Sequence, residues 1–352
     1  MNAHLAYVSG RAYVFQDFYW SHEHYLWPKE QWVSVWPRTP LNAIVAGPVA
    51  GGPFDDGDPA PRAVSADWFD VVCPPRERRY INTRDVKPAV ASAPGPAVLA
   101  HWQALLRAAP ERCIEIVAAR ADEDTFPQTF DLGLWGSPRV LPLFPALAAS
   151  PISRRLRASP LVRAAVARNV HLFPPRTDPF AHMLAVHLRR GDYAVHCRGL
   201  AAGNAPFYSW NVLPALPDRF EPEPDAPGKD ERVLARCYPD VAGVVRKAAA
   251  ARADHLAHAG HNATLDVLYV LTNERGAWLD TLKNALRDDG WRVAASADLV
   301  LDAEQVDVGM AVDMEIARRA AVFLGNGWSS FTSNVVYTRL VDGRAARDIR
   351  FL

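Results

Sequence analysis

The sequence has few cysteines, no long apolar run and no excess of charge of either sign. Its four cysteines, Cys73, Cys113, Cys197 and Cys237, show no C-x-x-C spacing, which argues against a structural zinc site. The 39 basic and 39 acidic residues balance, so no nucleic acid partner is expected. No stretch approaches the roughly 18 apolar residues of a membrane-spanning helix, and no charged-then-apolar leader stands at Met1. We therefore expect no membrane segment in this chain.

Signatures of cofactor chemistry are also missing. The chain contains no P-loop and no complete dinucleotide-binding G-x-G-x-x-G motif, so redox chemistry on a nucleotide cofactor is not supported. Asp122-Glu123-Asp124 and Asp56-Gly57-Asp58 spell the metal-binding D-x-D pattern, but neither lies beside a convincing strand. We interpret both as solvated loop acids and expect neither a metal nor another cofactor.

The even number of cysteines leaves two interpretations open. Cys197 and Cys237 bracket a proline-rich insertion that a disulfide would stabilise, whereas buried free thiols are the alternative. The triplet Asn262-Ala263-Thr264 is a glycosylation sequon, which is used only in the secretory pathway.

Strand and helix patterns alternate along the chain in two blocks, as in proteins built on parallel sheets. The 352 residues suffice for two domains with separate cores. Three prolines within residues 174–179 predict a linker, because proline neither continues a helix nor donates in a sheet. We predict an α/β protein with Rossmann-like domains over residues 1–173 and 180–352.

The periodicity predicts individual elements in each block. The first block is predicted to contain strands at 11–15 and 113–118 and helices at 98–109 and 152–167. The second is predicted to contain strands at 183–188, 267–272, near Trp291 and at 320–324, with helices at 241–258, 277–288 and 310–319.

The run Val186-His187-Leu188-Arg189-Arg190-Gly191-Asp192-Tyr193 places two arginines at the carboxyl end of a buried strand. Open α/β sheets bind ligands at that edge, and the guanidinium fork matches phosphate oxygens, so the pair predicts a diphosphate ligand. Because adjacent strand residues point to opposite faces, we expect one arginine to matter more and favour Arg189, which shares the face of His187. The alternative is a surface pair neutralised by Asp192.

A second segment, downstream of this one, predicts an anion site. A short apolar strand at 320–324 leads through Gly325-Asn326-Gly327 into the polar run 328–334. Glycines permit a tight turn, hydroxyl residues suit helix N-caps, and the N-terminus of a helix offers N–H groups and a positive dipole end. The alternative is an ordinary capped helix.

On these residues the chain resembles the GDP-fucose fucosyltransferases, which include protein O-fucosyltransferases, α1,6-fucosyltransferases and a bacterial nodulation fucosyltransferase. The resemblance rests on three motifs in matching order and spacing, namely His187-x-Arg189-Arg190-Gly191-Asp192, Asp313 ten residues before Phe323-Leu324-Gly325-Asn326, and Ser329-Ser330-Phe331-Thr332. The segment Gly10 to Phe15 is similar to the first helix-to-strand passage of the family. The family's Gly-Gly-x-x-Asn-Gln loop should precede that passage, and we expect it to be missing because the chain begins too late.

The resemblance implies a GT-B architecture, with an acceptor-side first domain and a nucleotide-sugar-binding second domain facing a cleft. It implies inverting, metal-independent transfer of fucose from GDP-fucose to a hydroxyl of a protein Ser/Thr or of a glycan, in the lumen of the ER or Golgi. Arg189 and Arg190 are the candidate catalytic residues at the leaving diphosphate. The candidate donor-binding residues are His187, Asp192, Asp313, Ser329, Ser330, Phe331 and Thr332. In the family, the residues at the positions of His187 and Asp313 recognise guanine.

Two other functions stay open, a GDP-sugar-binding protein without turnover and a transferase that uses another GDP-sugar. In some relatives a Glu of the glycine-rich loop acts as the base, and no residue of this chain matches it. Position alone offers Asp17 and Glu23, and neither is assigned the role.

Overall fold

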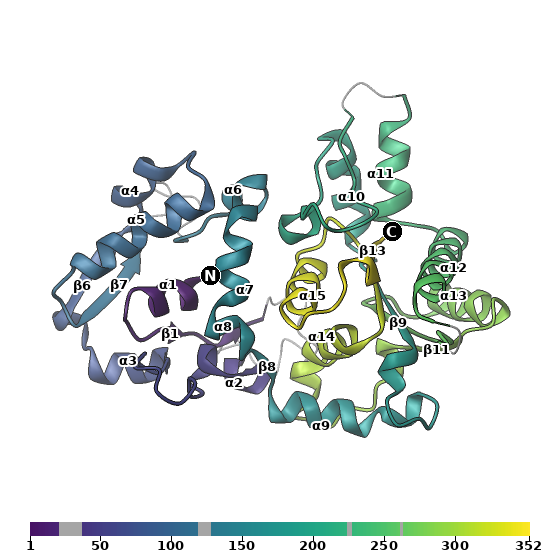
Figure 1. Cartoon of the computed structure of the whole chain (residues 1–352), viewed down its shortest axis with the longest axis horizontal. Coiled ribbons are helices and arrows are strands. Elements are labelled where there is room, and N and C mark those ends of the chain that lie inside the picture. Colours follow the sequence, from purple (N-terminus) through teal and green to yellow (C-terminus); the bar gives the residue numbers. More distant parts are fainter. Residues whose placement is uncertain (21–36, 119–127, 224–226, 261–262) are drawn as a thin grey trace. The chain divides into compact units, whose positions relative to one another are not determined.

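The computed structural model describes residues 1–20, 37–118, 128–223, 227–260 and 263–352 (Figure 1). The chain divides into two compact units, Met1–Val162 and Arg163–Leu352. The division falls inside helix α9 (Pro160–Arg168), ahead of the predicted linker. Among the helices of the described ranges, none is long and apolar enough to cross a membrane.

The proline-rich stretch 174–179 lies within unit 2 and does not separate the units. Arg176 donates to both carboxylate oxygens of Asp266, at 2.7 and 2.8 Å, and the ring of Phe180 is buried just beyond. The prolines do interrupt regular structure here, as predicted. The ion pair and the buried ring nevertheless attach the stretch to the second unit, which therefore begins earlier than the predicted residue 180.

Unit 2 is built on a five-stranded parallel sheet with the order β11-β10-β9-β12-β13. All six residues of β9 pair with β10, and Leu184, Ala185 and Val186 pair with β12 on the other edge. The elements of unit 2 are β9 (Met183–Leu188), α10 (Tyr193–Ala202), α11 (Lys229–Cys237), α12 (Val241–His258), β10 (Val267–Thr272), α13 (Ala277–Asp288), β11 (Arg292–Ala295), α14 (Gly309–Arg319), β12 (Val322–Gly325), α15 (Ser330–Val341) and β13 (Ile349–Phe351).

Helices cover both faces of this sheet, with α12 and α13 on one side and α14 and α15 on the other (Figure 1). Every residue of β9 is buried, which explains why its sequence is an unbroken apolar run rather than an alternation. Leu184, Val186 and Leu188 pack with α12 and α13 in one core cluster. The intervening residues, His187 among them, therefore face α14 and α15.

Unit 1 has short strands that pair two by two. Within the described residues β1 pairs with β5 and β6 with β7 in parallel, whereas β2 pairs with β3 and β4 with β8 antiparallel. The sequence predicts a Rossmann-like sheet here, whereas the described strands form separate two-stranded pairs. The elements are α1 (Asn2–Val8), β1 (Val14–Phe15), β2 (Phe18–Tyr19), β3 (Arg38–Thr39), α2 (Leu41–Ile44), β4 (Val45–Ala46), β5 (Val64–Ser65), α3 (Ala66–Val72), β6 (Arg78–Asn82), α4 (Thr83–Val86), α5 (Gly95–Ala108), β7 (Cys113–Val117), α6 (Leu132–Trp135), α7 (Phe144–Ala149), α8 (Pro151–Arg154) and β8 (Arg157–Ala158).

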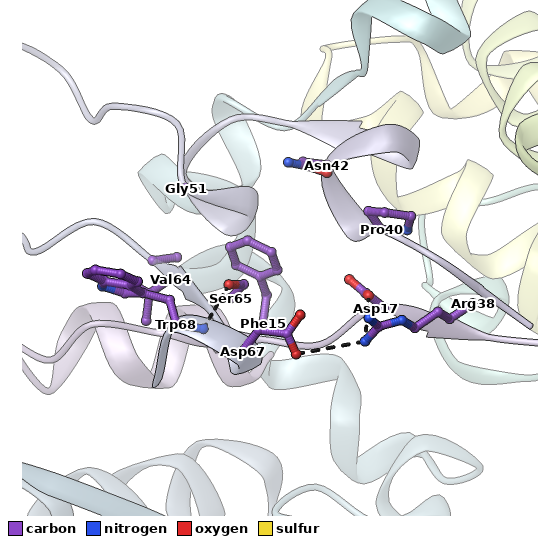
Figure 2. Close-up of a pocket in the computed structure, with 11 residues that line it drawn as sticks. Phe15, Asp17, Arg38, Pro40, Asn42, Gly51, Val64, Ser65, Asp67 and Trp68 are labelled. Atoms are coloured by element: carbon purple, nitrogen blue, oxygen red, sulfur yellow. Dashed lines mark hydrogen bonds and ion pairs between the residues drawn. The ribbon is translucent and has the colours of Figure 1, made fainter. Parts of the chain in front are cut away.

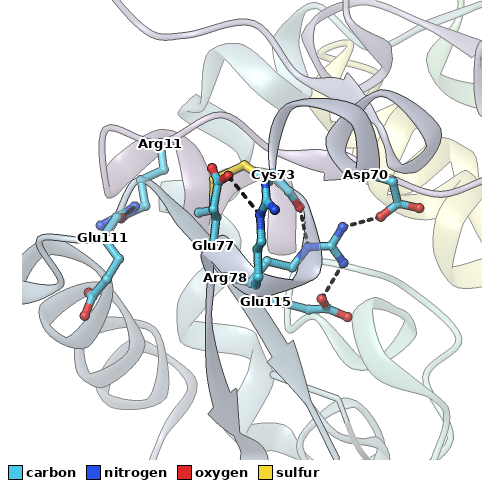
Figure 3. Close-up of a disulfide and its surroundings, with 9 residues drawn as sticks. Arg11, Asp70, Cys73, Glu77, Arg78, Glu111 and Glu115 are labelled. Carbon is cyan, nitrogen blue, oxygen red and sulfur yellow. Dashed lines mark hydrogen bonds and ion pairs between the residues drawn. A yellow bond between two sulfur atoms is a disulfide. The ribbon is translucent and has the colours of Figure 1, made fainter.

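A disulfide joins the end of α3 to the start of β7 in unit 1 (Figure 3). Cys73 is bonded to Cys113, and Arg78 of β6 reinforces the junction by donating to the Cys73 carbonyl at 2.6 Å. The same guanidinium pairs with Asp70 of α3 at 2.5 Å and with Glu115 of β7 at 2.8 Å. Helix α3 is thus held to the β6–β7 ladder by one covalent and several polar links.

The second disulfide, Cys197–Cys237, joins α10 to the last residue of α11. Of the two interpretations that the sequence left open, the structure has the disulfide. It brackets the long insertion after α10, and the insertion is partly buried rather than solvated. Phe207, Trp210 and Leu216 are all buried.

Several predicted helices coincide with the structure, and one does not. The predictions at 241–258 and 277–288 are confirmed by α12 and α13. The predicted helix at 152–167 is wrong, because the chain forms α8, the short strand β8 and then α9, which begins at Pro160. Pro160 removes a helical donor and disfavours helical backbone in the residue before it.

We predict that Gly327→Ala destabilises the protein. A Cβ on Gly327 would lie 2.4 Å from ring atoms of Phe207, which is itself buried and packed against the rings of Trp328 and Phe351. Overpacking of this kind costs about 1–3 kcal/mol of unfolding free energy, measurable by thermal or denaturant unfolding.

Gly199→Ala is the matched control for Gly327→Ala. Gly199 lies within α10 and a Cβ there would have no neighbour within 4 Å. Alanine favours helix over glycine by up to about 1 kcal/mol, so this variant is expected to be as stable as the parent or more so. Equal stability of the two variants would contradict the proposed packing at Gly327.

Candidate nucleotide-sugar site

The site of unit 2 lies at the carboxyl ends of β9 and β12. From the central strand β9 the chain builds β10 and β11 on one side, and then crosses to build β12 and β13 on the other. The strand order therefore reverses between β9 and β12, and such reversal points are where open α/β sheets bind ligands. The arginine motif follows β9 directly, and the run Ser329 to Thr332 follows β12 and begins α15.

The turn after β9 is fixed by Asn273, which follows β10. Its side chain accepts from the Arg190 amide at 2.8 Å and donates to the Arg190 carbonyl at 3.1 Å. Gly191 has φ +63°, a backbone conformation that glycine adopts without steric cost. The two bonds and the positive φ of Gly191 together redirect the chain after Arg190.

Arg189 remains at the edge of the sheet. Its Nη2 donates to Asp192 Oδ2 at 3.0 Å, and its guanidinium lies 5.9 Å from the Tyr193 ring centroid. The Tyr193 hydroxyl donates to the Trp328 carbonyl at 3.3 Å, so this arm of the turn reaches the segment that precedes α15. About 30% of the Arg189 side chain is exposed, which leaves part of the fork accessible to an anion. Asp192, predicted to bind the donor, is paired with Arg189, the arginine that we expect at the diphosphate.

The structure corrects the interpretation of Arg190 as a diphosphate ligand. Its guanidinium lies between two rings, 3.8 Å from the centroid of Tyr238 and 3.7 Å from that of Trp278. Nη1 donates to the Pro239 carbonyl at 2.9 Å, and Nε lies 3.6 Å from Glu274. Only 9% of the side chain is exposed. A fork enclosed in this way stabilises the α12–α13 face of the unit, because both of its planar surfaces and one donor are already used.

The first turn of α15 forms the other side of the site. Asn326 shapes the approach, because its side chain accepts from the Trp328 amide at 3.0 Å and donates to the Cys237 carbonyl at 2.7 Å. Ser329 occupies the N-cap position without accepting a hydrogen bond from the helix, which differs from the predicted hydroxyl cap. Ser330 is exposed. The first-turn N–H groups and these two hydroxyls are therefore suited to an anion.

His187, Phe331 and Thr332 converge, as the motifs predict. His187 Nδ1 is hydrogen-bonded to the Thr332 hydroxyl at 2.8 Å, and the imidazole lies 4.7 Å from the ring centroid of Phe331. Burial, together with the nearby charge of Arg189, lowers the pKa of His187 to about 3. The imidazole is thus neutral at physiological pH and acts as a hydrogen-bonding group rather than as a cation.

Asp313 of α14 is a partly buried carboxyl with two hydroxyl donors. The Tyr269 hydroxyl donates to Oδ1 at 2.6 Å, and the Ser296 hydroxyl donates to Oδ2 at 2.7 Å. Burial raises the pKa of Asp313 to about 6 despite these two bonds, which act in the opposite direction. Each carboxylate oxygen keeps capacity for a further hydrogen bond when ionised.

The insertion after α10 supports the segment between β12 and α15. Asn211 donates to the Gly327 carbonyl at 2.8 Å, and the Tyr208 amide donates to the same oxygen at 2.9 Å. Trp328 Nε1 donates in return to the Ala205 carbonyl at 2.8 Å. These contacts pack the insertion against the segment between β12 and α15, so this part of it is not an exposed surface loop.

Three features singled out in the sequence lie outside the described residues, namely Asp122-Glu123-Asp124, Glu23 and Asn262. Asp58 of the other D-x-D match accepts hydrogen bonds from the Tyr7 hydroxyl and the Ala60 amide. In the part of the chain that the structure describes, no three His, Cys, Asp or Glu side chains gather as a metal site would require.

Asp17 lies at a pocket of unit 1 with a volume of about 530 Å³ (Figure 2). It forms an ion pair with Arg38 at 3.4 Å. Asp17 stands just past β1, as the sequence suggests.

The sequence motifs missed Asn273, Tyr269 and Ser296. Asn273 carries a usable signal, because it stands directly after a predicted strand, where the carboxyl edge of the sheet lies. The roles of Tyr269 and Ser296 depend on the approach of α14 to β10, for which the local sequence gives no signal.

Comparisons with known proteins bear on the fold. No protein-family model matches the sequence, and no curated protein does. Solved structures do match. A structure of POFUT1, a protein O-fucosyltransferase, in complex with GDP-fucose gives a TM-score of 0.54 at 15% identity, covering 96% of this chain and 88% of that one. A GDP complex of POFUT1 gives 0.52 at 14% identity (100% and 92% covered), and an apo-form gives 0.51 at 16% (99% and 91%).

The chain has the fold of POFUT1. The predicted α/β class is thereby confirmed, and so, for the fold, is the resemblance to GDP-fucose fucosyltransferases. The likeness extends over nearly the whole of both chains and includes unit 1, where the sequence motifs are sparse.

We predict that substitution by alanine destabilises the protein more at Arg190 than at Arg189. Arg190→Ala should lower the unfolding free energy by about 2–4 kcal/mol, because it leaves Tyr238 and Trp278 facing a cavity and removes a desolvated cation–π contact. Arg189→Ala should change it by less than about 1 kcal/mol, because the Arg189–Asp192 pair lies near the surface. Urea unfolding of the two variants checks the difference. Equal losses of unfolding free energy in the two variants would contradict the packing of Arg190 between Tyr238 and Trp278.

Proposed function

We propose that this protein is an inverting, metal-independent fucosyltransferase with a GT-B-type arrangement, which moves fucose from GDP-fucose to a hydroxyl of a protein or glycan acceptor. The observation that carries the proposal is the convergence of Arg189, His187 and the first turn of α15 at the strand-order reversal of unit 2. The fold shared with POFUT1, whose structures include GDP-fucose and GDP complexes, supports the choice of donor.

The proposed chemistry needs an anion site where negative charge develops. As the bond between the anomeric carbon and the diphosphate oxygen breaks, charge accumulates on departing GDP, while the acceptor oxygen bonds to that carbon from the opposite face and its proton passes to a base. Arg189 and the N–H groups of Ser330 and Phe331 are suited to that charge without a metal ion. Ser329 and Ser330 contribute hydroxyl donors.

The proposed guanine contacts are Asp313 and His187. An ionised Asp313 accepts from the N1 and N2 donors of guanine, and adenine and uracil lack this donor pair. The hydroxyls of Tyr269 and Ser296 fix the orientation of the carboxylate from behind, since each donates to a different oxygen. Phe331 and Thr332 stand next to His187 and complete this part of the proposed site.

We place the protein in the secretory pathway lumen. Two disulfides support this, because such bonds persist in oxidising compartments and are rare in the cytosol.

Transfer activity tests the role of Arg189. We expect Arg189→Ala to lower turnover with GDP-fucose roughly 10²–10³-fold while the fold persists, because it removes a donor that meets developing charge. Arg189→Lys should restore little, because an ammonium does not reproduce the bidentate fork. GDP release with and without acceptors measures both, and calorimetric GDP binding shows whether the site remains intact.

The same assay discriminates the alternatives. Activity that persists in EDTA agrees with arginine-based neutralisation, whereas complete loss that manganese restores would return Asp122 and Asp124 to consideration. Tight GDP-fucose binding with no GDP release under any acceptor would favour a binding protein. Faster turnover of another GDP-sugar would change the donor. Near-parental transfer by Arg189→Ala would contradict the proposal.

Donor binding should depend on pH through Asp313. The pKa of about 6 means that the carboxyl is largely ionised above pH 7 and largely protonated below about pH 5. GDP-fucose affinity should therefore be constant above pH 7 and fall about tenfold per unit well below pH 6, because a protonated oxygen no longer accepts from guanine. His187 stays neutral through this range, since its pKa is about 3. The diphosphate of GDP-fucose is esterified at both ends and loses no proton here.

Asp313→Asn is the control for this titration. The variant should bind GDP-fucose about tenfold more weakly or worse at pH 7.5 and lose the pH dependence, because an amide presents one acceptor and one donor. UDP-glucose should bind poorly to the parent protein. Calorimetry that finds equal affinity for the two nucleotide sugars, or an unchanged pH profile in the variant, would remove Asp313 from the guanine site.

A further inference from the structure

Unit 1 contains a pocket that the donor site does not use (Figure 2). Its volume of about 530 Å³ lies within the 300–1,000 Å³ typical of small-ligand sites. In Figure 2 the ring of the buried Phe15 lies between Asn42 and Asp67, with Asp17 and Arg38 on one side and Trp68 on the other. The lining therefore combines apolar surface with hydrogen-bonding groups.

The charges of the pocket disfavour an anion. Two carboxylates, Asp17 and Asp67, face a single guanidinium, that of Arg38, at 3.4 and 3.8 Å. Both distances exceed the roughly 2.7–2.9 Å of a charge-assisted hydrogen bond, so the carboxylate oxygens and the fork keep capacity for a ligand. Net charge from these three groups is negative, which a phosphate or nucleotide would not tolerate. Acceptors and donors side by side suit neutral hydroxyl groups, which both donate and accept.

Trp68 supplies the second feature that a sugar needs. It belongs to α3, and 55% of its surface is exposed although it is large and apolar. An indole presents a broad rigid face, and sugar rings carry one face of C–H groups that packs on such a surface. Helix α3 is also rigidly placed, since the disulfide and the Arg78 ion pairs described above fix it to β6 and β7.

We propose that this pocket binds a saccharide. Asp17, Arg38 and Asn42 bind the hydroxyls, and Trp68 packs on the apolar face of the ring. This inference concerns unit 1 alone and is independent of the proposed transferase function.

Disaccharide binding to the full chain tests the inference without requiring turnover. Lactose, N,N′-diacetylchitobiose and maltose are titrated by saturation-transfer NMR in the absence of a donor. At least one should bind, with a dissociation constant on the order of 1 mM. Trp68→Ala and Asp17→Asn should each weaken it tenfold or more. Tyr80→Ala is the matched control, because Tyr80 is 51% exposed in the same unit but does not line the pocket.

The outcomes separate this inference from the proposed function. GDP-fucose binding is measured in the same samples. If GDP-fucose binds but no disaccharide does, or if Trp68→Ala binds like the parent, the saccharide subsite is refuted and the transferase proposal stands. If disaccharides bind but GDP-fucose does not, the saccharide site stands and the transferase proposal is refuted.

Discussion

Hydrogen bonding on both edges of β9 leaves its side chains only two directions in which to project. Leu184, Val186 and Leu188 go to the α12–α13 core, and His187 goes to the α14–α15 face. Arg190 follows the same alternation as Leu184, Val186 and Leu188, so its side chain projects to the α12–α13 side of the sheet. There its guanidinium packs between two aromatic rings and donates to a backbone carbonyl. Arg189 stays at the edge with Asp192. One backbone alternation thus gives two neighbouring arginines different surroundings, with Arg190 enclosed by aromatic rings and Arg189 partly exposed at the edge of the sheet.

The other half of the site depends on supports from outside its own segment. The residues between β12 and α15 are bonded to the insertion after α10 at Ala205, Tyr208 and Asn211, and to the Cys237 carbonyl. Catalytic stabilisation of charge requires donors that are already oriented before the charge appears. The insertion therefore holds the segment before α15 in place from outside that segment.

Much of unit 2 was predictable because its local signals agree with one another. Strong periodicity predicts α13, residues that favour helices predict α12, and an unbroken apolar run predicts β10. The three-residue strand β13 was missed, since so short a run carries no period. The helix predicted at 152–167 is wrong, because apolar spacing continues across Pro160 whereas the helical backbone does not.

The candidate site divides in the same way. Motif order and strand alternation brought His187, Arg189 and Thr332 together correctly, since they lie at the ends of adjacent strands. The enclosure of Arg190 depends on the rings of Tyr238 and Trp278. The hydrogen bonds to Asp313 depend on Tyr269 and Ser296. These partners come from distant parts of the chain, and only the packing of helices on the sheet decides which of them meet. Local patterns carry no record of that packing.

The carbonyl that anchors Asn326 belongs to Cys237, and Cys237 is half of a disulfide. The polypeptide that precedes α15 is therefore connected, through one hydrogen bond and one covalent bond, to α10. Loss of the covalent bond would free the end of α11 and with it the acceptor on which the Asn326 side chain depends. Protein produced in a reducing cytosol is then expected to retain its sheet while the loop before α15 loosens. Preparations should be compared by their thiol content before their nucleotide affinities are compared.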